Sequence, residues 1–100
     1  MIKVSKIKDF LKNEEDNKIL MVATPTCGAC KMMVPIMKRV EQETSFKIFE
    51  IDGSENKEDL REYGVQTVPT FLISVKNELK ETLQGYAPKE KIVEQLQLLI

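Results

Sequence analysis

Two cysteines, Cys27 and Cys30, carry the strongest chemical signal in this sequence. They are the only cysteines of the chain, and Gly28 and Ala29 separate them. A Cys-x-x-Cys pair can alternate between a dithiol and a disulfide, or it can supply half of a tetrahedral zinc site. The spacing by itself leaves both chemistries open.

Metal binding is the weaker interpretation of this pair. A closed zinc site takes four ligands, most often Cys and His side chains. The chain has no histidine and no third cysteine, so only carboxylates could complete a site within it. A cluster shared by the cysteine pairs of two subunits is a more remote alternative. The lack of histidine also excludes a Cys-His hydrolase, and we expect a redox pair and no metal site.

The neighbourhood of the pair favours the redox interpretation. Residues 18–23 are predicted to form a buried strand, Thr24-Pro25-Thr26 is typical of a turn, and helical apolar spacing extends from Cys27 to about residue 43. The free N–H groups and the positive dipole at such a helix start stabilise a thiolate. We therefore expect Cys27 to be the nucleophile. Cys30, one helical turn further on, would be the resolving thiol within reach of a disulfide.

The composition limits the class of protein. With 42% hydrophobic and 31% charged residues, the 100-residue chain is predicted to fold as one domain, residues 1–100. Its 15 basic and 16 acidic residues are spread along the sequence, so no basic stripe is available for nucleic acid. We expect no nucleic-acid partner.

A membrane segment and an export signal are also not expected. The longest apolar run, residues 19–23, is far shorter than the roughly 18 residues that a membrane helix needs. Charges interrupt residues 1–9, where a secretory signal would be apolar. The sequence therefore predicts a cytoplasmic protein in which paired cysteines serve redox chemistry.

The other segments alternate between helix and strand. Ser5 is predicted to cap a short helix with Ile7, Phe10 and Leu11 facing inward, and Gly64 is placed to end a helix over residues 56–63. Strands are expected at residues 46–51, 70–75 and 78–84, and a last helix after Pro88. If residues 1–4 form a short strand, the order is βαβαβαββα. This order predicts an α/β fold, a central mixed β-sheet flanked by helices on both faces.

Several motifs in the same order resemble the thioredoxin family along nearly the whole chain. They are Cys27-Gly28-Ala29-Cys30-Lys31, Pro35, Asp52 at the end of the central strand, Tyr63-Gly64-Val65, Val68-Pro69-Thr70 and Gly85. The resemblance implies a thioredoxin-like fold and a protein disulfide oxidoreductase. It also implies that the Val68-Pro69 bond is cis, lies against the cysteines and offers the Val68 backbone to a bound peptide.

The resemblance further implies a substrate surface around the Cys27 sulfur. Its rim would consist of Gly28, Ala29, Val68, Pro69, Gly85 and Tyr86. Without the resemblance, Pro69 would be an ordinary strand-leading proline. Gly85 and Tyr86 could equally form a plain turn at the end of a hairpin.

The implied activity is reduction of protein disulfides in two exchange steps, with Cys27–Cys30 as the redox-active disulfide. The protein would need no bound cofactor. Electrons would come from NADPH through a flavin-dependent thioredoxin reductase. The expected partners are this reductase and disulfide-containing proteins, and we expect the protein to be a monomer.

Four departures from the family pattern concern the site. Thr26 replaces the usual Trp, Ala29 the usual Pro, Met21 a buried Asp, and Ile48 the Lys commonly paired with that Asp. The resemblance implies that in typical relatives this Asp accepts the proton of the resolving thiol. The departures leave the fold and the nucleophile in place, but they bear on redox potential, proton transfer and the choice of partner.

Two other functions stay open. Thr67-Val68-Pro69-Thr70 is also similar to glutaredoxins, which suggests a carrier recharged by glutathione. Glutaredoxins usually carry Cys-Pro-Tyr-Cys, however, and no glutathione site is recognisable here. From a different class, the chain could be a redox-switched module that binds a partner through the rim around the cysteines.

Overall fold

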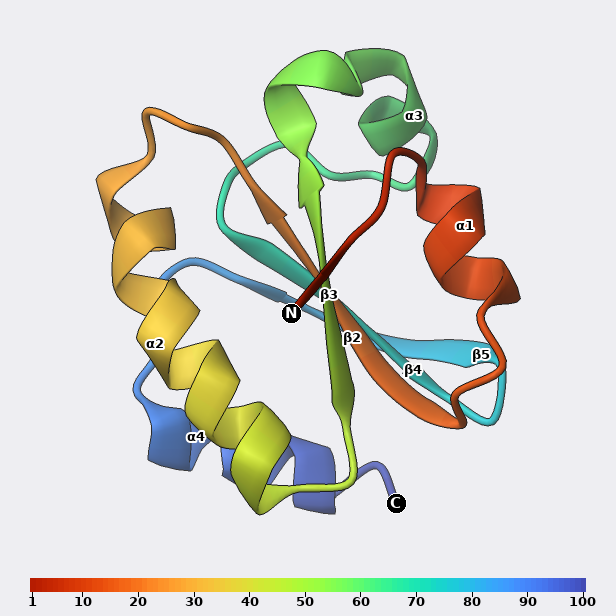
Figure 1. Cartoon of the computed structure of the whole chain (residues 1–100), viewed down its shortest axis with the longest axis vertical. Helices are drawn as coiled ribbons and strands as arrows, with labels where there is room; N and C mark the ends of the chain where they lie inside the picture. Colours follow the sequence, from red (N-terminus) through yellow and green to blue (C-terminus); the bar gives the residue numbers. More distant parts are fainter.

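Five strands form one mixed sheet at the centre of the molecule (Figure 1). The structure, a computed structural model, describes all residues 1–100. The strands, in spatial order, are β1 (Ile2–Lys3), β3 (Lys47–Asp52), β2 (Asn17–Ala23), β4 (Thr70–Val75) and β5 (Glu78–Gln84). β1 and β2 run parallel to β3, whereas β4 is antiparallel to both β2 and β5. The predicted mixed sheet is confirmed.

Helices cover both faces of this sheet, as predicted (Figure 1). One face carries α2 (Gly28–Glu43) and α4 (Lys89–Gln97). The other carries α1 (Ile7–Lys12) and α3 (Lys57–Glu62), the latter preceded by a short 3₁₀ turn at Gly53–Glu55. None of these helices combines the length and the hydrophobicity that a membrane-spanning segment requires.

The central strand β2 is buried on both faces, which explains its continuous apolar sequence. Ile19 and Met21 point into the core beneath α2 and α4, while Leu20 and Val22 point into the core beneath α1 and α3. Because neighbouring strands and both helix layers hold β2, the position of its carboxyl end is fixed. The turn that leads to Cys27 starts from this end.

The end of α3 agrees with the sequence prediction. Gly64 adopts a positive φ of 71°, a conformation that glycine accepts without strain. Its N–H donates to the Arg61 carbonyl at 3.1 Å, and the Val65 N–H donates to the Leu60 carbonyl at 3.0 Å. These two bonds form a Schellman ending and lead the chain into the loop before β4.

Lys18 in β2 is fully buried, which is rare for a lysine. Its ammonium donates to the carbonyls of Leu11 at 3.0 Å and Asn13 at 2.6 Å, at the C-terminal end of α1. The same Nζ lies 5.2 Å from the centre of the Phe10 ring. Burial lowers the pKa of Lys18. This side chain therefore fastens the end of α1 to the sheet.

The beginning of α1 differs from the sequence prediction. The N-cap is Lys6, which makes no side-chain capping bond, so the assignment of Ser5 as the cap was wrong. Instead the Ile7 N–H donates to Oδ2 of Asp59 at 2.9 Å. The capping carboxylate comes from α3, 52 residues along the chain, where a local pattern cannot reveal it.

We expect Asp59→Ala to lower the free energy of unfolding by about 1 kcal/mol, because the Ile7 N–H loses its acceptor. Ser5→Ala should change it by less than about 0.5 kcal/mol, since Ser5 is exposed and does not cap the helix. Equilibrium unfolding in urea measures both values. A larger loss for Ser5→Ala than for Asp59→Ala would contradict this description of α1.

Candidate active site

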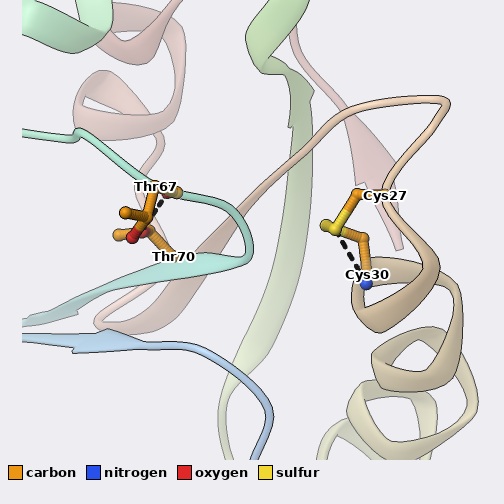
Figure 2. Close-up of a disulfide and its surroundings, with 4 residues drawn as sticks. All are labelled: Cys27, Cys30, Thr67 and Thr70. Carbon is orange, nitrogen blue, oxygen red and sulfur yellow. Dashed lines mark hydrogen bonds between the residues drawn. A yellow bond between two sulfur atoms is a disulfide. The ribbon is translucent and has the colours of Figure 1, made fainter.

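Cys27 and Cys30 form a disulfide at the start of α2. Cys27 is the N-cap residue, and its Cα lies 5.2 Å from that of Cys30. The Cys27 Sγ accepts a hydrogen bond from the Cys30 N–H at 3.1 Å (Figure 2). The predicted placement at a helix start is therefore confirmed. After reduction, an N–H donor in this position would stabilise a Cys27 thiolate.

The two cysteines differ in exposure. Cys27 is partly exposed, whereas Cys30 is only 2% exposed. Gly28 between them is exposed, and a Cβ at this position would meet no atom within 4 Å. A bulky partner can therefore approach Cys27 from the side of Gly28, while Cys30 is shielded by the protein.

The loop before β4 lies at the same edge of the sheet. Val22 of β2 pairs with Thr70 of β4 in antiparallel register. Pro69, which precedes Thr70, therefore lies beside the end of β2, where the chain turns toward Cys27. The tip of the loop between Thr67 and Thr70 points toward the disulfide (Figure 2). The Val68-Pro69 bond is cis, as the family resemblance implies. Val68 is half-buried and Pro69 is buried.

Thr70 positions this loop, a role that the sequence analysis missed. Its buried hydroxyl donates to the Thr67 carbonyl at 2.6 Å and closes the base of the loop (Figure 2). A threonine three residues after a carbonyl in a turn is a known local bonding pattern, so the Thr67-Val68-Pro69-Thr70 motif did contain the signal.

Gly85, the residue after β5, is hydrogen-bonded to the loop that carries Pro69. Its N–H donates to the Pro69 carbonyl at 2.8 Å, and its φ of 83° favours glycine. Tyr86 follows and is 52% exposed; it borders a groove between the end of β5 and α4. Of the predicted rim residues, Pro69 and Gly85 are thus joined by a hydrogen bond. Ala29, in the first turn of α2, is half-buried.

The interior beneath α2 contains no buried carboxylate. Met21 and Ile48 are both buried and belong to one apolar cluster with Met33 and Met37 of α2. The only buried polar or charged side chains in the protein are Lys18, Thr70 and Ser74. The structure also contains no group of three His, Cys, Asp or Glu side chains that could hold a metal ion.

The mixed sheet, the cysteine pair at the start of α2 and the adjoining proline loop define the class of thioredoxin-fold thiol–disulfide oxidoreductases. A family model described as thioredoxin matches residues 1–98. The thioredoxin of Listeria monocytogenes is 33% identical over 96 residues, covering 91% of this chain and 93% of the relative. The thioredoxin of Bacillus subtilis is 42% identical over 72 residues, covering 70% and 69%. The chain belongs to the thioredoxin family.

Solved structures agree on the fold. A mutant thioredoxin from Halobacterium salinarum superimposes with a TM-score of 0.88 at 22% identity, covering 97% of this chain and 88% of that one. The reduced thioredoxin of Schistosoma mansoni gives 0.86 at 18% identity, covering 99% and 97%. The predicted thioredoxin-like fold is confirmed. Family membership and the Cys-x-x-Cys disulfide make this protein a thiol–disulfide oxidoreductase of protein disulfides.

We expect Met21→Asp to accelerate resolution of a mixed disulfide at Cys27 by tenfold or more near neutral pH, since general-base help is worth about 10²–10⁴ in rate. In the unaltered protein, the resolution rate should rise with pH and show no step from a carboxylate. Stopped-flow release of a thiol reporter from the preformed mixed disulfide gives both rates.

Met21→Asn is the matched control, because it buries a polar group of the same size without a base. Both variants should lose a few kcal/mol of stability. Equal resolution rates in folded Met21→Asp and Met21→Asn would show that the protein does not lack an internal base.

Proposed function

We propose that the protein is a dithiol reductase in which Cys27 attacks and Cys30 resolves. The Cys27 thiolate attacks one sulfur of a substrate disulfide, forms a mixed disulfide and displaces the other sulfur as a thiolate. Cys30, as a thiolate, then attacks the Cys27 sulfur and releases the second substrate thiolate, leaving the Cys27–Cys30 disulfide. The observation that carries this assignment is the exposure of Cys27 beside a 2% exposed Cys30.

The proposed substrate surface follows the rim predicted from the sequence: Gly28, Ala29, Val68, Pro69, Gly85 and Tyr86. Its central element is Val68, whose backbone N–H and carbonyl form no hydrogen bond within the protein. An extended substrate segment can pair with these two groups, as a strand pairs with a sheet edge. Such pairing would hold the substrate disulfide beside Cys27.

We further propose that electrons reach the disulfide from NADPH through a flavin-dependent thioredoxin reductase. Disulfide-containing proteins are the proposed substrates. A cytoplasmic location, expected from the sequence, belongs to the same proposal, because a reducing compartment favours net reduction. The monomeric state expected from the sequence is also part of the proposal.

Insulin reduction tests the function. With NADPH and a thioredoxin reductase, the protein should reduce insulin at a rate well above the blank, and glutathione with glutathione reductase should not replace this donor. Efficient turnover with glutathione alone would instead assign a glutaredoxin-type carrier. If neither donor supports reduction but the double variant Cys27→Ser/Cys30→Ser still binds cellular partners, the protein acts as a binding module.

Trapping tests the roles of the two cysteines. Cys30→Ser should accumulate mixed disulfides with substrate proteins, because nothing resolves the bond at Cys27. Cys27→Ser should accumulate few or none, since Cys30 is buried. Non-reducing gels after alkylation show the adducts. Equal trapping by the two variants would refute the assignment.

A further inference from the structure

A groove of about 670 Å³ opens beside the loop that carries Val68. Its walls include Thr67 and Val68 of this loop, Thr24 of the turn before Cys27, and Lys57 and Arg61 of α3. The Thr24 carbonyl accepts the Cys27 N–H at 3.2 Å, so this end of the groove lies within one turn of the nucleophile. The groove therefore reaches from the turn before Cys27 to the two cations of α3.

The charge of this groove has a single sign. Lys57 and Arg61 are its only charged residues, and no carboxylate lines it. Both side chains are exposed, and their spacing of four places them on one face of α3. Neither side chain forms a salt bridge or a hydrogen bond within the protein. Lys57 also lines a second groove, whose lining includes Glu55, Glu58, Asp59 and Glu62, whereas Arg61 does not line that acidic groove. With no partner inside the protein, the two cations can bind an anionic group that enters the groove beside Val68.

Another groove, which shares Thr24 with the first, provides a contrast. It also includes Thr24, but its lining combines Lys3 and Lys6 with Glu50, Asp52 and Glu55. Its own carboxylates offset its lysines, and so it offers no comparable site for an anion. The positively charged lining without carboxylates is a local feature of the groove beside Val68, present although the whole chain has a net charge of -1.

We propose that this groove selects substrates in which an acidic residue flanks the reactive cysteine. The inference rests on the proposed function, since the substrate must pair with Val68 to place its next residues in the groove. Arg61 can bind a carboxylate through two parallel N–H bonds, and Lys57 adds a second positive charge. A basic residue at the same substrate position would be repelled, which sharpens the selection.

Three disulfide peptides that differ only in Glu, Gln or Lys beside the cysteine test this inference. Prereduced full-length protein is mixed with each peptide, and the second-order rate of reduction is measured in a single turnover, without a reductase. We expect the Glu peptide to react about threefold to tenfold faster than the Gln peptide, and the Lys peptide to react more slowly. The differences should shrink at high salt, because the cations are exposed.

Charge reversal identifies the residues responsible. Lys57→Glu/Arg61→Glu should invert the order of the three peptides, and Lys57→Gln/Arg61→Gln should abolish the preference. Lys38→Glu/Arg39→Glu is the matched control: it changes the net charge equally on exposed residues of α2 that line neither groove, and it should retain the original order.

The outcomes separate this inference from the proposed function. If the Gln peptide is reduced normally but Glu and Lys peptides react equally fast, the selection is wrong and the reductase function stands. A preference that persists in folded Lys57→Gln/Arg61→Gln, or that disappears in the α2 control, also overturns it. A protein that reduces none of the three peptides overturns the proposed function and this inference together.

Discussion

The antiparallel register between β2 and β4 is the constraint on which the site depends. Pairing of Val22 with Thr70 places the chain after β2 and the chain before β4 at the same edge of the sheet. Cys27 follows the first segment and Pro69 ends the second. Because side chains alternate along a strand, a shift by one residue would move the apolar residues of β2 to the wrong cores. Burial on both faces of β2 therefore keeps the cysteines and the proline loop together.

Polar groups in the interior are confined to one side of the sheet. Lys18, Thr70 and Ser74 all lie on the face covered by α1 and α3, since they alternate with residues of the core beneath α2. There Lys18 finds backbone carbonyls at the end of α1, and Thr70 closes the proline loop. The face beneath the cysteine helix is apolar, with Met21 where typical relatives carry a carboxylate. Because the core beneath α2 contains no polar side chain, the chemistry of the site takes place at the surface, around Cys27.

In the binding mode that we propose, a substrate would contact both backbone groups and charged side chains near the disulfide. The unpaired backbone of Val68 would pair with any extended segment, whatever its side chains. Lys57 and Arg61 line the groove beside Val68 and, in the same proposal, would select by the charge of the segment. A general docking element next to a charge-selective groove would let one disulfide reduce many proteins at different rates.

The sequence by itself determined the order of elements, the placement of Cys27 and Cys30 at a helix start and the helix end at Gly64. These features depend on local periodicity and on backbone conformations that single residues dictate. Only the tertiary structure decided that Asp59 caps α1, that Lys18 is buried under its other end, and that Arg61 shares a groove with the loop before β4. Each of these contacts joins groups on different elements. Their proximity arises from how the helices pack on the sheet, which no local pattern encodes.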